Sequence, residues 1–487
     1  MSPSANQLVT MDLFIDGASR PGSAGARYER YDPATGKLVG SFALAGADDA
    51  GAAIGAARRS FDAGDWVHAT GAAKADVLLR AADLLAARRE RFAQWESVTS
   101  GAPIGQARQM IDWVHDLLRY YAGLARDVHG ETTTFGRDLL AFTLREPVGV
   151  ATLIAPWNFP LNQAAWKICP ALAAGCSIVV KPDSQTPATT LAFAALLTEA
   201  GLPPGVINVV TGEVNEIGDT LLTDERVDMF SFTGSTASGR RVMELAARSL
   251  KRVSLELGGK SPNVIFPDAD LDAAATAAAW GIFWRAGQVC TAASRLFVHA
   301  SVHDEVVERL VATAKTMRIG SPTREDVDLG PVISPSHLAR IERYVASGMA
   351  EGASLRYGGR RLTDGELADG AYIEPTVFTG VRPGMTIAQE EVFGPLLAVL
   401  SFETVEEAIA LANGTAFGLA SGVWTGDMRT ALRVARGLQA GTVWVNGWGI
   451  VNPEVPVGGW KASGFGRELG RAGLDEFLIS KSVHVAG

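Results

Sequence analysis

The stretch VGVATLIAPWNFPLNQAAWKICPALAAGCSIVVKPDS, residues 148–184, alternates between the patterns of a strand and of a helix. Short apolar runs at 148–154 and 177–180 are typical of buried strands, and the longer amphipathic segment at 161–174 is typical of a helix. The alternation continues, with expected strands at 206–210, 227–232 and 253–257 and expected helices at 188–200, 216–222 and 238–250. It predicts an α/β fold in which helices cover both faces of a parallel sheet.

A second block of the same kind follows, with expected strands at 295–298, 396–402, 421–424 and 442–446 and expected helices at 302–317 and 405–412. Residues 74–126 have apolar side chains at three- and four-residue spacing, which indicates packed helices. A chain of 487 residues is longer than one ordinary domain. We therefore expect two α/β domains that meet near Gly258 and Gly259, with the active site in the cleft between them.

Composition narrows the classes of function. The net charge of −9 without a long basic run argues against nucleic-acid binding, and neither a signal sequence nor a membrane-length apolar segment is evident. Three cysteines without a regular framework indicate free thiols in a reducing compartment. The seven histidines do not form a ligand-spaced cluster with them, so no catalytic metal is expected. A cytoplasmic enzyme with a small-molecule substrate is the resulting prediction.

Two glycine-containing motifs carry the chemistry: LELGGKS, with Glu256, and FWRAGQVCT, with Cys290. A cysteine thiolate attacks an electrophilic carbon, and a carboxylate can activate the water that releases the covalent product. An exposed Glu256 paired with Lys260 or Lys251 is an open alternative. Cys169 and Cys176, in an Ala-rich apolar segment, are interpreted as buried structural thiols.

Four loops are candidates for contacts with a cofactor or with an oxyanion. The turn from Gly234 to Gly239 follows a strand and could bind phosphate at a helix N-terminus, or Ser235 or Thr236 could simply cap the helix. Lys181 and Ser184 follow another strand, at an edge where open α/β sheets bind nucleotides. The other two loops are 156–160, in which Asn158 could stabilise an oxyanion, and 390–395, in which Glu391 could bind ribose. A plain structural turn is the alternative for each.

Together these motifs resemble the NAD(P)-dependent aldehyde dehydrogenase superfamily over nearly the whole chain, from FIDG at 14–17 to GFGRE at 464–468. The resemblance implies a Rossmann-like cofactor domain, formed by residues 1–126 and 146–258, and a catalytic domain at 259–473. It also implies a small oligomerisation β-extension, formed by residues 127–145 and 474–487, in a homodimer or homotetramer.

By the same resemblance, Cys290 is the nucleophile that forms the thiohemiacetal, Glu256 is the base for thioester hydrolysis, and Asn158 holds the oxyanion with the backbone N–H of Cys290. Hydride transfer goes to NAD or NADP. The implied cofactor contacts are Ile154, Pro156, Trp157, Lys181, Ser184, Gly234, Ser235, Gly239, Leu257, Glu391 and Phe393.

Two positions depart from common family patterns. Relatives that prefer NAD often have glutamate at the position of Ser184, where an acid would repel a 2′-phosphate, so serine makes NADP admissible. The implied substrate tunnel has aromatic walls at Phe159, Trp166 and Trp284, as in betaine- and amino-aldehyde relatives. Val457 replaces a further aromatic position, so aromatic and medium-chain aldehydes are alternatives.

Two other functions are weighed against oxidation with hydrolysis. A CoA-acylating relative generally lacks the glutamate base that Glu256 supplies. A structural or binding protein of the same fold without turnover would have no need of Cys290, Glu256 and Asn158 together.

Overall fold

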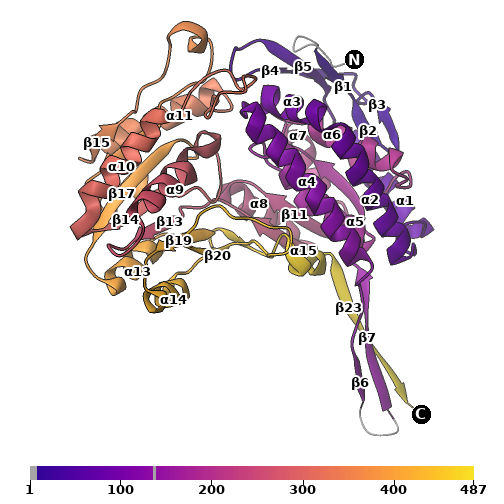
Figure 1. Ribbon diagram of the computed structural model, residues 1–487. Coiled ribbons are helices and arrows are strands. Elements are labelled where there is room, and N and C mark those ends of the chain that lie inside the picture. Colours follow the sequence, from indigo (N-terminus) through magenta and orange to yellow (C-terminus); the bar gives the residue numbers. More distant parts are fainter. Residues whose placement is uncertain (1–7, 135–138, 487) are drawn as a thin grey trace.

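A computed structural model of the chain describes residues 8–134 and 139–486 and contains two large sheets (Figure 1). The first sheet has the strand order β22-β12-β11-β8-β9-β10-β2-β3. The bounds of its strands are β2 Leu13–Ile15, β3 Ala18–Arg20, β8 Val150–Ile154, β9 Ser177–Lys181, β10 Ile207–Val209, β11 Met229–Thr233, β12 Arg252–Glu256 and β22 Gly464–Phe465. Strands β12, β11, β8, β9 and β10 pair in parallel, which confirms the predicted parallel sheet.

The two edges of this sheet are antiparallel, and sequence analysis did not anticipate them. Strand β22 is only two residues long, which is too short for a periodic pattern. Strands β2 and β3 form a hairpin through Asp16 and Gly17, whose φ angles are 58° and 76°. An Asp-Gly pair in this conformation is a strong hairpin signal.

Both faces of the first sheet are buried because its side chains alternate. Val150 and Ile154 of β8 join the core beneath α1 (Ala47–Ala63), α7 (Val214–Thr223) and α8 (Thr236–Ala247). Ala151 and Leu153 point to the opposite face and join the core beneath α2 (Gly71–Ala87), α4 (Ile104–Ala125), α5 (Pro160–Ala174) and α6 (Ala188–Glu199). This double burial explains why the strands appear as continuous apolar runs.

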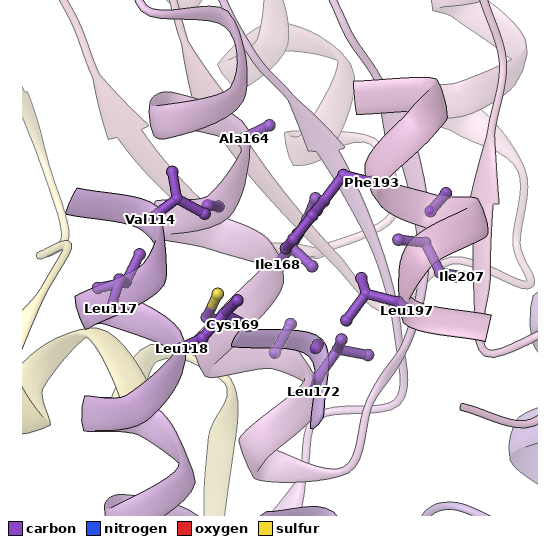
Figure 2. Packing of buried hydrophobic residues seen from close by; sticks show 14 of the residues in the cluster. Val114, Leu117, Leu118, Ala164, Ile168, Cys169, Leu172, Phe193, Leu197 and Ile207 are labelled. Atoms are coloured by element: carbon purple, nitrogen blue, oxygen red, sulfur yellow. The ribbon is translucent and has the colours of Figure 1, made fainter. Parts of the chain in front are cut away.

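The second of these cores is drawn in Figure 2. Leu118 of α4, Ile168 and Leu172 of α5 and Leu197 of α6 pack in one cluster, and the sulfur of Cys169 lies among them. Burial raises the pKa of Cys169, so the group is an inert thiol. Cys176 is also buried, and its pKa is raised to about 12. The structural interpretation of both cysteines agrees with this burial.

The second sheet has the order β15-β16-β17-β14-β13-β19-β20, and only its β15–β16 edge is antiparallel. Its strands are β13 Pro262–Ile265, β14 Arg295–His299, β15 Ser354–Tyr357, β16 Thr376–Thr379, β17 Leu396–Phe402, β19 Ala420–Trp424 and β20 Thr442–Val445. One face is covered by α9 (Leu271–Phe283) and α10 (His303–Thr316), and the other by α11 (Pro335–Ala350), α13 (Val405–Asn413) and α14 (Met428–Gly437). The predicted α/β class is confirmed for this block too.

Sequence analysis missed three strands of this sheet, β13, β15 and β16, and β13 is the one that lies next to the site. It lies in the middle of the sheet and starts only two residues after Lys260. Pro262 and Asn263 are residues that strands usually avoid, so the segment lacked a strand pattern. Because β13 follows β12 almost directly, the chain passes from the first sheet to the second through Gly258 and Gly259.

A three-stranded antiparallel sheet stands away from the rest of the molecule in Figure 1. It consists of β6 (Thr132–Thr134), β7 (Leu139–Pro147) and β23 (Leu478–Ala486). Residues 135–138 and 487 of the expected oligomerisation segments lie outside the described residues, as do residues 1–7 of the expected cofactor domain.

The remaining elements complete the chain: β1 Val9–Met11, β4 Arg27–Tyr31, β5 Leu38–Ala43, α3 Arg89–Ser100, α12 Thr386–Gln389, β18 Phe417–Gly418, β21 Trp460–Lys461 and α15 Gly470–Glu476. Among the helices of the described residues, none combines the length and the apolar character that crossing a membrane requires. Over the same residues, no group of three or more His, Cys, Asp and Glu side chains is arranged to hold a metal ion.

Candidate active site

Glu256 is the last residue of β12, and its side chain is only 6% exposed. Within the described part of the chain, its Oε1 atom has no hydrogen-bond partner. Burial raises the pKa of Glu256 well above its ordinary value, and the nearby carboxylate of Glu468 raises it further. The alternative of an exposed residue paired with Lys260 or Lys251 is therefore wrong. A carboxylate with a raised pKa is a stronger base than an ordinary glutamate, which suits a general base.

Lys167 of α5 and Glu468 form a buried ion pair beside Glu256. The Lys167 Nζ atom also donates to Thr233 Oγ1 at 2.6 Å, and Thr233 is the strand partner of Glu256 in β11. A buried ion pair loses its hydration, so it needs such additional hydrogen bonds to offset the cost. One lysine thus serves two neighbouring carboxyl groups, which favours keeping a proton on one of them.

Gly258 and Gly259 allow three segments to meet at the end of β12. The Gly259 N–H donates to Glu391 Oε1 at 2.9 Å. A Cβ atom on Gly259 would lie 2.3 Å from the carbonyl oxygen of Cys290, and one on Gly258 would lie 2.3 Å from Glu391 Oε2. Only residues without a side chain permit this approach. The glycines therefore place the cysteine loop and Glu391 directly against the strand that carries Glu256.

Cys290 lies in a loop that follows α9 and a short 3₁₀ turn, Trp284–Gly287. Within that turn, Arg285 and Ala286 have φ angles of 54° and 52°. Holding a residue with a Cβ atom in this left-handed region costs on the order of 1–3 kcal/mol. Surrounding contacts must therefore hold the cysteine loop in its shape.

The thiol of Cys290 is partly exposed, as a nucleophile must be. Burial of its surroundings raises its pKa to about 12, and the carboxylates of Glu391 and Glu256 contribute in the same direction. Since the carboxylate of Glu256 contributes to the raised pKa of the Cys290 thiol, the two side chains are close enough to interact electrostatically. The group rests as a thiol, so attack on a substrate requires removal of its proton.

Asn158 lies between β8 and α5, with 4% of its surface exposed. Its Nδ2 atom donates to the backbone carbonyl of Gln288 at 2.9 Å. Gln288 is two residues before Cys290, so the carboxamide is fixed next to the cysteine loop. A carboxamide fixed before substrate arrives can stabilise an oxyanion without reorganising.

Several expected cofactor residues lie at the carboxyl ends of adjacent parallel strands. Lys181 ends β9 and pairs with Ile154 at the end of β8. Burial lowers the pKa of Lys181, while the carboxylates of Asp183 and Glu213 oppose that shift. Ser184 is half-buried in the loop after β9, and Pro156 and Trp157 lie in the loop after β8. This is the edge at which doubly wound sheets bind nucleotides.

The turn after β11 continues the same edge. The Ser235 hydroxyl accepts from Ser238 N–H at 3.1 Å, so Ser235 caps α8 as the structural alternative proposed. Ser235 is also exposed at the first turn of the helix, where free N–H groups favour a phosphate. A Cβ on Gly239 would lie 2.6 Å from Leu257 Cδ2, so this glycine lets α8 pack closely against the end of β12.

Glu391 and Phe393 belong to a loop held by aromatic contacts and hydrogen bonds. The Phe393 and Trp157 rings are 5.3 Å apart, and His337 Nε2 lies 2.7 Å from the Phe393 carbonyl oxygen. Burial raises the pKa of Glu391 to about 6. The structure thus brings Trp157 and Phe393 together, and it anchors Glu391 through Gly259.

Two of the expected tunnel residues pack against each other. Phe159 and Trp284 have ring centroids 5.5 Å apart, and Trp113 of α4 adds a third ring 6.0 Å from Trp284. Trp166 and Val457 pack against the core beneath α2, α4, α5 and α6. The firmest part of the aromatic wall is therefore the group of Trp113, Phe159 and Trp284.

Sequence analysis missed four neighbours of this site: Trp113, Lys167, His337 and Glu468. Lys167 lies in an otherwise apolar helix pattern, and a charged residue there was a usable signal because it must be paired when buried. Glu468 was quoted only as the end of a motif. The sequence around Trp113 and His337 gave no signal. These residues are far from the other site residues along the chain and come close to them only in the folded protein.

Known proteins resemble this chain over almost its whole length. The aldehyde dehydrogenase family profile matches residues 20–483. The betaine aldehyde dehydrogenase of Bacillus subtilis (strain 168) is 42% identical over 98% of this chain and 97% of its own length. A crystal structure of an NAD-dependent aldehyde dehydrogenase from Sinorhizobium meliloti has a TM-score of 0.97 and 44% identity, over 100% of this chain and 97% of the other. For a betaine aldehyde dehydrogenase from Staphylococcus aureus in complex with NAD+, the values are 0.96 and 40%, over 98% and 95%.

The chain therefore belongs to the aldehyde dehydrogenase family. This confirms the resemblance and the enzyme class that sequence analysis inferred, an NAD(P)-dependent aldehyde dehydrogenase.

Proposed function

We propose that this protein oxidises an aldehyde to a carboxylate through a covalent thioester on Cys290. The observation that carries the proposal is the buried carboxyl of Glu256, whose Oε1 atom has no partner among the described residues, at the end of the strand that Gly259 brings against the Cys290 loop. The Cys290 sulfur bonds to the aldehyde carbon and the thiol proton moves to the aldehyde oxygen, which gives a thiohemiacetal. Loss of hydride from the carbon and of that proton from the oxygen leaves a thioester. Water activated by Glu256 then hydrolyses the thioester.

Asn158 acts on the oxygen that becomes negative in the first and last steps. Its carboxamide and the backbone N–H of Cys290 would share that charge. The Glu256 carboxylate accepts a proton from water as the water oxygen bonds to the thioester carbon, and it becomes a neutral carboxyl beside the ion pair of Lys167 and Glu468. That pair is buried in contact with Thr233, so it changes the field at Glu256 without itself touching substrate.

NAD or NADP is the cofactor of this proposal, and solved relatives hold NAD+. The residues fit such a group, because Lys181, the turn from Gly234 to Gly239 and Glu391 lie along one sheet edge. When bound, the nicotinamide accepts the hydride. Ile154, Pro156, Trp157, Leu257 and Phe393 would line the same region, and Ser184 leaves room for NADP because it carries no repelling charge.

Two active-site variants test the mechanism. Cys290→Ala should form no reduced cofactor from any aldehyde. Glu256→Gln should give a burst of about one reduced cofactor per active site and then stall, because the base acts only in hydrolysis. Stopped-flow absorbance of the reduced cofactor separates the two phases. Steady turnover by Cys290→Ala would contradict the mechanism.

An aldehyde panel resolves the substrate class, the cofactor and the competing functions. It includes betaine, amino, aromatic and medium-chain aldehydes, each with NAD and with NADP. Relatives named as betaine aldehyde dehydrogenases make the cationic aldehydes first candidates, and the rings of Phe159 and Trp284 could face a cation. A CoA-acylating enzyme would need added CoA, and a protein without turnover would reduce neither cofactor. A large preference for NAD would show that Ser184 does not decide the cofactor.

The wider organisation is also part of the proposal. Residues 1–126 with 146–258 bind the cofactor, residues 259–473 carry the nucleophile, and the extension formed by β6, β7 and β23 joins subunits into a dimer or tetramer. The three cysteines are unpaired, as a reducing, cytoplasmic location would require.

A further inference from the structure

Arg285 is a buried arginine five residues before the nucleophile, and only 2% of it is exposed. Among the residues that the structure describes, no carboxylate lies within ion-pairing distance of its guanidinium. Its Nη2 atom instead donates to the backbone carbonyl of Asn158 at 2.8 Å and to Ser100 Oγ at 3.2 Å. A buried guanidinium loses its hydration, and here hydrogen bonds to two neutral acceptors replace it at a cost in free energy. The contact therefore serves to hold both acceptors in place.

The contacts of Arg285 close a ring around Asn158. The Gln288 side chain donates to the Arg285 carbonyl at 3.0 Å, and the Gln288 carbonyl accepts from Asn158 Nδ2 at 2.9 Å. Gln288 is fixed in turn, because its Oε1 atom accepts from the Ile333 backbone N–H at 2.8 Å. Asn158 is therefore bound to the cysteine loop twice, through its main chain by Arg285 and through its carboxamide by Gln288.

The far side of the ring rests on α3. Ser100 Oγ donates to the Glu96 carbonyl at 2.6 Å. The Glu96 side chain is fully buried, and its Oε1 accepts from Leu161 N–H at 3.0 Å and from Thr189 Oγ1 at 2.7 Å. Leu161 is the second residue of α5, the helix that follows Asn158, so Glu96 fixes that end of the loop. The carboxylate of Glu96 also acts favourably on the charge of Arg285.

The backbone conformation of Arg285 gives a second reason for these contacts. Arg285 and its neighbour Ala286 both have φ values near +50°, which a residue with a Cβ adopts only under constraint. The guanidinium bonds to Asn158 and Ser100 tie the strained turn to two other segments. Strain in the cysteine loop and the position of Asn158 are thus coupled through one side chain.

We propose that Arg285 is a positioning residue that fixes Asn158 against the cysteine loop and so sets the geometry of the oxyanion site. The proposal rests on the proposed function, because it needs Asn158 to stabilise an oxyanion. Arg285 acts through Asn158 and touches neither substrate nor cofactor in this role.

A double-mutant cycle tests the coupling. Arg285→Met should lower the rate of the reduced-cofactor burst about tenfold or more in the wild-type background, at saturating aldehyde and cofactor. In an Asn158→Ala background the same change should lower it less than about twofold, because the group being positioned is gone. Equal fold-losses in both backgrounds would overturn the role of Arg285.

Arg295→Met is the matched control. Arg295 is also 2% exposed and also donates to backbone carbonyls, those of Lys260, Leu411 and Ala412, away from Asn158. Its loss should lower thermal stability and change the burst by the same factor in both backgrounds. A coupling to Asn158 as large as that of Arg285 would show that any buried arginine has this effect, and would overturn the proposal.

Arg285→Lys guards against a variant that fails to fold. Lysine keeps the charge and can reach one acceptor, so it should recover part of the burst rate that Arg285→Met loses, with the KM for cofactor unchanged. Arg285→Gln is a second uncharged variant beside Arg285→Met. A burst rate in Arg285→Lys that is no higher than in these two variants would contradict the role of Arg285 in positioning Asn158. A wild-type burst in Asn158→Ala alone, or turnover in Cys290→Ala, would overturn the proposed function and this proposal with it. Equal fold-losses for Arg285→Met in both backgrounds would overturn only the role of Arg285.

Discussion

Three carboxyl groups near the cysteine loop, Glu256, Glu391 and Glu468, are removed from water to different degrees. Glu391 keeps one hydrogen bond, from Gly259 N–H, and its pKa rises to about 6. Glu256 lacks a partner for Oε1 and its pKa rises further. The balance between burial and hydrogen bonding thus gives the two carboxyl groups different properties. Glu391 suits a binding group, and Glu256 suits a base.

The pH dependence of cofactor binding follows from Glu391. Its pKa is raised from an ordinary 4.5 to about 6, so the charged form dominates above pH 6 and is lost as the pH falls through 6. A protonated carboxyl is a poorer acceptor for ribose hydroxyls. We expect the KM for cofactor to rise roughly tenfold between pH 7 and pH 5, following the fraction protonated around that pKa.

Glu391→Gln supplies the control for this pH effect. The amide cannot titrate, so its KM should be high at every pH and flat from pH 5 to 8. Initial rates at varied cofactor and saturating aldehyde measure both proteins. A wild-type KM that does not change over this range would contradict the assignment of Glu391.

At the scale of elements, the end of β12 is the point on which the site depends. The two glycines after the strand carry the chain into the second sheet and admit both the cysteine loop and Glu391. Packing of β11, β12 and α8 holds the strand end fixed, and the close approach at Gly239 contributes to that packing. The site therefore lies on rigid elements, as precise catalytic geometry requires.

Gly259→Ala tests this dependence. The new Cβ would lie 2.3 Å from the Cys290 carbonyl oxygen, a backbone atom that cannot move without the cysteine loop. We expect a stability loss of about 1–3 kcal/mol from overpacking and at least a tenfold loss of burst rate, because small displacements of reacting groups are costly. Chemical denaturation and stopped-flow absorbance measure the two effects.

The matched control is Gly123→Ala in α4, where no atom lies within 4 Å of the added Cβ. Alanine there should raise stability by about 0.5–1 kcal/mol, since glycine is a poor helix former, and should leave the burst rate unchanged. If Gly259→Ala behaved like this control, the close approach at β12 would be unimportant.

At the scale of the whole molecule, the extension formed by β6, β7 and β23 is the part whose contacts with other subunits a single chain does not show. Four large apolar side chains on it are more than a third exposed: Leu140, Leu144, Ile479 and Val485. A long strand pair with exposed apolar groups is a surface that monomeric proteins avoid. This supports its proposed role in joining subunits.

Replacing Leu140, Leu144 and Val485 together by Lys should lower the oligomeric state, because the charges would be buried at the subunit contact. Size-exclusion chromatography with light scattering reads the mass, and circular dichroism shows whether the protomer remains folded. Met349→Lys, at a half-exposed site on α11, serves as the control and should keep the wild-type mass. An unchanged mass in the triple variant would remove the extension from the interface.

The alternating pattern and the two glycine motifs were enough to predict the α/β sheets and the pair Glu256 and Cys290, because strand and helix periodicity and motif spacing are local properties. They were not enough for β13, which begins with Pro262, or for the two-residue β22. Element patterns fail where a strand is short and its place in the sheet comes from neighbours.

The amino-acid order alone determined the class of fold, and it predicted the nucleophile, the base and the sheet edge suited to a cofactor. Only the tertiary structure decided that Glu256 is buried beside Lys167 and Glu468, and that Arg285 reaches the carbonyl of Asn158. The bonds from Lys167 to Glu468 and from Arg285 to Asn158 each join residues more than a hundred positions apart. Burial and hydrogen bonding at such distances depend on how the packed elements cross, and no local pattern along the chain encodes that crossing.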